Sequence, residues 1–128
     1  MKKIVSLLTV VLILTAAVFA QTKKNKIVSE EKAKITFVEL GSVNCIPCKQ
    51  MQPVMKSIEK KYGSQIKVVF HDVWKEDQKQ YAEKYGIKLI PTQVFLDENG
   101  KEIMRHEGFY AEKEIDKFLQ GKGLKILN

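Results

Sequence analysis

Two cysteines, Cys45 and Cys48, are the only cysteines in this chain of 128 residues, and two residues separate them. The motif follows an apolar, β-rich segment and opens a segment of helical periodicity, so we expect it at the N-terminus of a helix. Unpaired backbone N–H groups and the helix dipole stabilise a thiolate there. In such motifs the pKa of the first cysteine falls from about 8.5 to roughly 3.5–7.5. We therefore predict that Cys45 is a nucleophile and that Cys48 is the resolving thiol.

The intervening residues, Ile46 and Pro47, support this interpretation. One turn of helix brings the two sulfurs within bonding range, so a mixed disulfide on Cys45 can be released by attack from Cys48. Pro47 fits the first turn because the N–H that it lacks would have been unpaired.

Three other uses of the cysteine pair stay open. A structural disulfide that closes so short a loop would stabilise the fold only weakly. A zinc site would need His71 and His106, which lie 35 residues apart on separate predicted strands, far from zinc-finger spacing. Copper(I) held by the two thiolates is chemically reasonable. Redox exchange is the chemistry that the motif favours most.

The segments around the motif predict the order β-α-β-α-β-β-α. We expect strands over residues 35–40, 66–70, 93–96 and 102–105, and helices from the motif to Tyr62, over 78–85 and over 111–120. The first half requires parallel crossovers, whereas residues 97–100 carry a hairpin signal. The predicted fold class is therefore α/β, with a central mixed sheet flanked by helices. Side chains assigned to packing rather than chemistry are Met51, Met55, His71, Trp74 and His106.

Residues 1–20 have the three parts of a secretory signal peptide. Two lysines precede an uncharged apolar run, and Val18-Phe19-Ala20 supplies the residues that a signal peptidase reads. The run is shorter than the roughly 20 apolar residues of a spanning helix, although an uncleaved copy would serve as a membrane anchor. We predict a signal peptide over 1–20, a polar linker over 21–33 and one domain over 34–128. The predicted location is periplasmic or otherwise extracytoplasmic, where disulfides persist.

The charge of the chain argues against nucleic-acid binding. Twenty-two basic and fifteen acidic residues give +7, and removal of the two lysines within residues 1–20 leaves +5. The lysines are dispersed, with no aromatic stripe of the kind that stacks bases, so we expect a solvated surface. A composition of 45% apolar and 29% charged residues excludes disordered and low-complexity classes.

Further residues resemble the thioredoxin family over about residues 34–120. Pro53 and Lys49 stand, relative to the second cysteine, where thioredoxins carry the proline that kinks the active-site helix and a common lysine. Lys84-Tyr85-Gly86-Ile87, followed by Ile90-Pro91-Thr92, is similar to the second signature of the family, in which the proline is cis. The resemblance implies a thioredoxin-like fold.

The resemblance also implies roles for residues outside the motif. A cis bond at Pro91 turns the chain so that the backbone of Ile90 lies beside the sulfurs and pairs with an extended substrate segment. Glu39 lies six residues before Cys45, where the family places a buried carboxylate, usually Asp. Such a carboxyl, with a raised pKa, would accept the Cys48 proton. The alternative is a solvent-facing Glu39 on an edge strand.

Two residues depart from the family pattern. Asn44 precedes the first cysteine, where cytosolic thioredoxins carry Trp, and Asp72 stands where spacing would place their buried lysine. The first difference concerns partner recognition and the second concerns proton transfer.

The function that the resemblance implies is thiol–disulfide exchange with protein thiols and disulfides, without an organic cofactor or a metal. Ile46 and Pro47 lack the His that stabilises the thiolate in oxidising relatives, which favours a reductant. The implied partners are a membrane-embedded thiol donor and, in cytochrome c maturation, apocytochrome c or other extracytoplasmic disulfides; the chain is expected to be a monomer. A copper(I) chaperone or a redox-inert binding module is the alternative.

Overall fold

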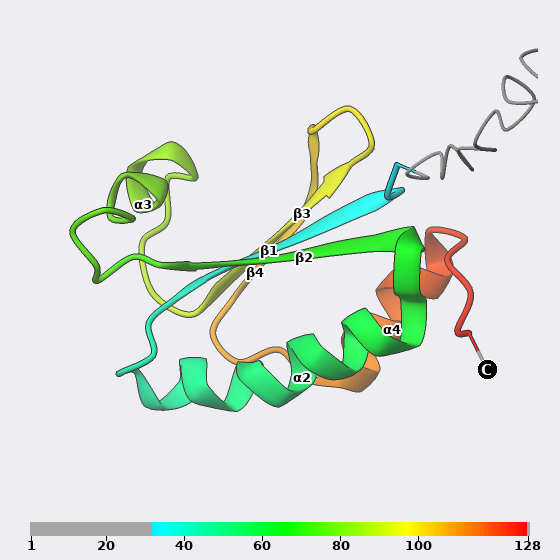
Figure 1. Cartoon of the computed structure of the whole chain (residues 1–128), viewed down its shortest axis with the longest axis horizontal. Coiled ribbons are helices and arrows are strands. Elements are labelled where there is room, and N and C mark those ends of the chain that lie inside the picture. Colours follow the sequence, from blue (N-terminus) through cyan, green and yellow to red (C-terminus); the bar gives the residue numbers. More distant parts are fainter. Residues whose placement is uncertain (1–31, 128) are drawn as a thin grey trace, which may run out of the picture.

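A computed structural model describes residues 32–127 as a four-stranded mixed sheet with helices on both faces (Figure 1). The predicted order is confirmed, and the predicted signal segment over 1–20 lies outside the described residues, as does most of the linker. None of the helices within 32–127 is long and apolar enough to cross a bilayer. In chain order the elements are β1 (Ile35–Gly41), α2 (Ile46–Tyr62), the 3-10 turn η1 (Gly63–Gln65), β2 (Ile66–Asp72), α3 (Gln80–Lys84), β3 (Thr92–Asp97), β4 (Glu102–Glu107) and α4 (Glu112–Gly121).

The strands run in the order β2-β1-β3-β4 across the sheet. β1 pairs in parallel with β2 and antiparallel with β3, and β3 pairs antiparallel with β4. The end of β1, the end of β2 and the start of β3 therefore meet at one edge of the sheet. The loop after β1 leads into the first turn of α2, and the loops on either side of α3 lie at the same end of the sheet (Figure 1).

Helices α2 and α4 cover one face of the sheet. The buried residues of α2, Met51, Val54, Met55, Ile58 and Tyr62, recur at helical spacing and pack with Phe37, Phe95, Ile115 and Leu119. Phe37 stacks on Phe95 with ring centroids 4.7 Å apart. Full burial of each such side chain stabilises the fold by roughly 1.5–3 kcal/mol. Both methionines fill the core, as predicted.

The short helix α3 lies over the opposite face, where Val38, Leu40, Val73 and Val94 form a second cluster. Its extent differs from the predicted 78–85, because the chain makes a turn before Gln80. The side chain of Gln78 accepts a hydrogen bond from the backbone N–H of Asp72 at 3.1 Å, which holds this residue in the turn.

Candidate active site

Cys45 and Cys48 form a disulfide at the N-terminus of α2, with their Cα atoms 5.2 Å apart. Cys45 is the N-cap residue, and its Sγ accepts a hydrogen bond from the backbone N–H of Cys48 at 3.3 Å. Cys45 is 8% exposed and Cys48 is wholly buried. A sulfur that accepts an N–H at a helix start is placed where the helix stabilises a negative charge. Cys45 is thus the more accessible of the two cysteines, and its role as the nucleophile stays a prediction.

The first turn of α2 favours a thiolate on Cys45 in other ways. Pro47 lies at the start of the helix, and no acidic side chain stands in this turn to oppose the charge. The loop before the helix is held by Ser42, whose carbonyl accepts the N–H of Cys45 and whose hydroxyl accepts the N–H of Asn44, both at 3.2 Å. Ile46 is 74% exposed and projects from the motif into solvent.

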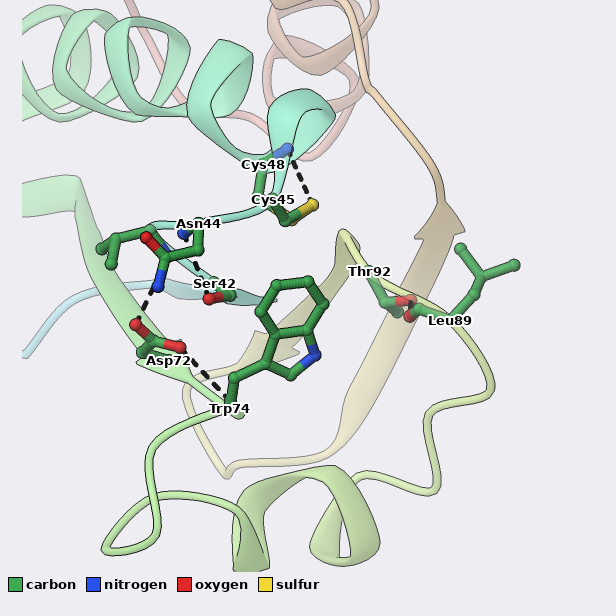
Figure 2. Close-up of a disulfide and its surroundings, with 9 residues drawn as sticks. Ser42, Asn44, Cys45, Cys48, Asp72, Trp74, Leu89 and Thr92 are labelled. Carbon is green, nitrogen blue, oxygen red and sulfur yellow. Dashed lines mark hydrogen bonds between the residues drawn. A yellow bond between two sulfur atoms is a disulfide. The ribbon is translucent and has the colours of Figure 1, made fainter.

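Asp72 joins the two loops that flank the disulfide. Its buried carboxylate accepts the backbone N–H of Val43 at 3.3 Å and that of Trp74 at 3.2 Å (Figure 2). These bonds compensate for the burial of the charge. In the strand register Asp72 pairs with Gly41, whereas Phe70 pairs with Glu39. The residue beside Glu39 on β2 is thus an apolar ring, and Asp72 acts as a loop cap.

Trp74 was assigned to packing in the core or at its rim, and the structure excludes the core position. The side chain is 62% exposed and lies beside the disulfide (Figure 2). The preceding residue, Val73, fills the core position after β2, and the N–H of Trp74 is held by Asp72, so the indole turns outward. We use the term rim patch for four exposed apolar side chains at this end of the sheet: Val43, Trp74 and Leu89 of the loops, and Ile46 at the first position of α2.

The Ile90–Pro91 peptide bond is cis, as the resemblance implies. The segment is anchored by hydrogen bonds from the hydroxyl of Thr92 to the Leu89 carbonyl and from the N–H of Gly108 to the Pro91 carbonyl, both at 2.7 Å. Within residues 32–127 neither the N–H nor the carbonyl of Ile90 has a backbone partner. Figure 2 shows this segment in the surroundings of the disulfide. Its backbone is free to pair with an extended peptide, and the substrate-binding role stays a prediction.

Glu39 lies on the buried side of the disulfide. The side chain is fully buried on β1, an internal strand, so the alternative of a solvent-facing residue on an edge strand is wrong. Gly41 lies two residues after Glu39 and on the same face of the sheet. A Cβ atom on Gly41 would lie 3.2 Å from both the Cβ and the Sγ atoms of Cys48. Gly41 thus lets the start of α2 approach the strand closely, and Glu39 faces the same side of the sheet as Cys48.

Burial raises the pKa of Glu39 to about 8, and the side chain of Gln93 partly opposes this rise. Gln93 stands directly opposite Glu39 on β3 and is also fully buried. A carboxyl with a pKa in this range can bind and release a proton near neutral pH, as a general base must. The structure therefore supplies the environment for the predicted role of Glu39, and the role itself stays a prediction.

Sequence reasoning did not identify Gln93. The available signal was an amide at the start of an otherwise apolar run, Gln93 to Leu96, in a strand expected to be central. Which residue it faces depends on the register between β1 and β3, which no local pattern gives.

The two histidines are not brought to the disulfide together. His71 lies on β2 and His106 on β4, the two outer strands of the sheet. Each stacks on a tyrosine, His71 on Tyr81 at 3.5 Å and His106 on Tyr110 at 4.1 Å between centroids. They cannot share one metal ion with the cysteines. No cluster of three or more His, Cys, Asp or Glu residues is arranged for a metal in the part of the chain that the structure describes.

Known proteins resemble this chain in sequence and in fold. A family model described as a thioredoxin-like domain matches residues 21–122. Thioredoxin-like protein 1 of Schizosaccharomyces pombe is 44% identical over 59 residues, which cover 46% of this chain and 20% of that protein. The thioredoxin of Bacillus subtilis is 29% identical over 91 residues, 71% of this chain and 85% of that one. The crystal structure of thioredoxin NaTrxh from Nicotiana alata aligns with a TM-score of 0.59 and 29% identity, over 73% of this chain and 76% of that one.

Proposed function

This chain belongs to the thioredoxin family and is a thiol–disulfide oxidoreductase, and from this premise we propose that it reduces disulfides of protein substrates outside the cytoplasm. The observation that carries the proposal is the asymmetry of the disulfide at the start of α2. Cys45 can be reached by a second protein, whereas Cys48 is enclosed over Gly41 on the side that carries Glu39.

The proposed reaction starts from the dithiol form. The Cys45 thiolate attacks a substrate disulfide, forms a mixed disulfide and displaces one substrate thiolate, which takes up a proton. Cys48 then gives its proton to the Glu39 carboxylate and attacks the Cys45 sulfur. This step releases the second substrate thiolate and closes the Cys45–Cys48 disulfide. Two electrons pass to the substrate, and a thiol donor must then reduce the disulfide again.

The rim patch and the backbone of Ile90 are the proposed contacts for the substrate. Exposed apolar side chains beside a reactive sulfur suit an unfolded or extended segment that carries its own apolar residues. The free N–H and carbonyl of Ile90 would pair with the backbone of that segment, while the apolar side chains set the preference among sequences.

The proposed direction of electron transfer and the proposed cellular location of the protein are inferred from the sequence. Ile46 and Pro47 offer no side chain that hydrogen-bonds the thiolate, which supports a reductant rather than an oxidant. Residues 1–20 support export, and an exported reductant needs electrons from across the membrane, hence a membrane-embedded thiol donor. Reduction of apocytochrome c during cytochrome c maturation is one process that would use such a protein.

Insulin reduction with dithiothreitol tests the activity. The protein should accelerate the precipitation of insulin, and a Cys45→Ser variant should not. Equal rates for the two would overturn the proposal in favour of a copper(I) chaperone or a redox-inert binding module. For the location, residues 1–33 fused to a phosphatase that is active only after export should give activity, and a fusion that lacks residues 1–20 should give none.

A further inference from the structure

Gln93 and Glu39 form a pair of buried polar side chains that the proposed reaction uses only in part. They face each other across β1 and β3, and both are fully buried. Gln93 lies close enough to lower the pKa of Glu39, yet neither carboxyl oxygen of Glu39 and neither polar atom of the Gln93 amide meets hydrogen-bond geometry with any partner among residues 32–127. A buried polar atom without a partner costs about 1–3 kcal/mol, so two neighbouring side chains in this state require an explanation.

The residues around Gln93 do not explain why a buried packing position carries an amide side chain. The next inward position on β3 is Phe95, a core residue, and an apolar side chain would fill the place of Gln93 without that cost. On the other side of Glu39, β2 supplies Phe70. No charged side chain contributes to the raised pKa of Glu39, which reflects burial and Gln93 alone. Cys48 lies on this side as well, above Gly41.

An amide suits a carboxyl that changes its protonation state. Its NH2 group can donate to the carboxylate, and its oxygen can accept from the protonated acid. A small rotation of one side chain therefore provides a partner for either form. A positively charged partner would favour the carboxylate only, and an apolar residue would favour the acid only.

We propose that Gln93 is a positioning residue for the Cys48 step, which hydrogen-bonds the Glu39 carboxyl in both protonation states and holds it ready to accept the Cys48 proton. This inference rests on the proposed function, because it assigns Gln93 a part in the resolution of the mixed disulfide. Gln93 acts through Glu39 and has no contact with the substrate.

The test measures the two steps separately with the full chain. Reaction of the reduced protein with the disulfide of thionitrobenzoate releases one coloured thiolate on attack by Cys45 and a second on resolution by Cys48. Gln93→Met keeps the length of the side chain and removes the amide. Without the amide the carboxylate is disfavoured, so we expect the second phase to slow about threefold to tenfold at pH 7 and to recover as the pH rises further above 8, where the Glu39 carboxylate forms even without the amide. The first phase should stay within about twofold.

Two controls separate positioning from packing. Phe95→Leu alters the same strand without touching the pair, so any slowing that it causes should be equal at all pH values. In a Glu39→Gln background, Gln93→Met should add no further slowing, because its effect passes through the carboxyl. Carboxyl-carbon NMR of the oxidised protein gives an independent readout: the Glu39 titration midpoint should move to higher pH in Gln93→Met.

Slowing that is the same at every pH, or that persists in the Glu39→Gln background, would overturn the inference, as would an unchanged NMR midpoint. These failures differ from failure of the proposed function. If the parent protein reduces insulin and Gln93→Met keeps the parental pH profile, only the role of Gln93 is lost. If the parent is no better than Cys45→Ser, the oxidoreductase proposal fails first.

Discussion

The two sulfurs of the disulfide face opposite environments. On the side of Cys45 lie exposed apolar side chains, Ile46 at 74% and Trp74 at 62% exposure. On the side of Cys48 the polar residues of β1 and β3, Glu39 and Gln93, are fully buried. In the proposed mechanism, recognition and proton transfer are therefore separated on the two sides of one bond. Changes on one side should therefore leave the chemistry of the other side intact.

The two sides are also built differently. The exposed side comes from loops, which the Asp72 carboxylate and Ser42 hold by hydrogen bonds to backbone N–H groups. The buried side comes from paired strands, in which register fixes each neighbour. Loops tolerate substitution, so the exposed side can vary with the partner. Paired strands in a core do not, which suits groups that must stay in place.

The largest effect is expected where the two sides must cooperate. Cys48→Ala leaves the proposed nucleophile, Cys45, and removes the resolving thiol, so turnover should be lost and a mixed disulfide with the substrate should accumulate. Non-reducing electrophoresis and mass spectrometry of extracytoplasmic extracts detect the adducts. Cys45→Ala is the matched control and should trap none. Equal trapping by both variants would contradict the two-step scheme.

Sequence reasoning found the parts of the site that are local in the chain. The Cys-Ile-Pro-Cys motif, the helical period from Met51 to Tyr62 and the hairpin around Gly100 each act over a few residues, and the element order follows from them. Glu39 was identified through its spacing from Cys45 within a family resemblance. These features need no knowledge of which strands pair.

The parts that were missed depend on contacts between distant segments. Gln93 faces Glu39 across 54 residues of sequence, as the register of β1 and β3 shows. Phe70 rather than Asp72 pairs with Glu39 for the same reason. The exposure of Trp74 depends on which neighbour fills the core, and composition assigns a lone Trp to the interior. Hydrophobic periodicity predicts which face of a strand or helix is buried, whereas the residues that this face contacts depend on the tertiary fold.

A second prediction concerns the buried side alone, as the pH dependence of stability. The pKa of Glu39 is raised from 4.5 to about 8 by burial, so the folded state favours the neutral acid. The contribution of the neutral Glu39 side chain to the free energy of unfolding is fully present below pH 4.5 and is lost as the pH rises through about 8. The free energy of unfolding of the oxidised protein should therefore fall by about 3 kcal/mol between pH 5 and 8.

Denaturant titrations at several pH values measure this fall, with Glu39→Gln as the control that cannot ionise. The variant should lack this fall. Groups elsewhere, such as His71, whose pKa burial lowers, contribute the same pH dependence to both proteins, so the difference between the two profiles isolates Glu39. Two profiles that run parallel from pH 5 to 8 would show that Glu39 does not carry a raised pKa, and the buried side would lose its proton acceptor.

The smallest effect, and the sharpest test of the separation, is expected at Trp74. Trp74→Ala removes the largest side chain of the rim patch from a position that contributes little to the core, so stability should change by less than about 0.5 kcal/mol. An aromatic contact to a substrate side chain is worth about 0.5–1.5 kcal/mol, so KM for insulin should rise about threefold to tenfold. Both phases with the small thionitrobenzoate disulfide should stay within about twofold, because that reagent is too small to need the patch.

Two control variants accompany this test. Trp74→Phe should restore most of the affinity. Ile126 is 46% exposed and lies near the C-terminal end of α2, away from the disulfide, so Ile126→Ala should leave KM unchanged. Equal losses with insulin and with the small disulfide would place Trp74 in the chemistry of the cysteines, and the two sides of the disulfide would then not be independent.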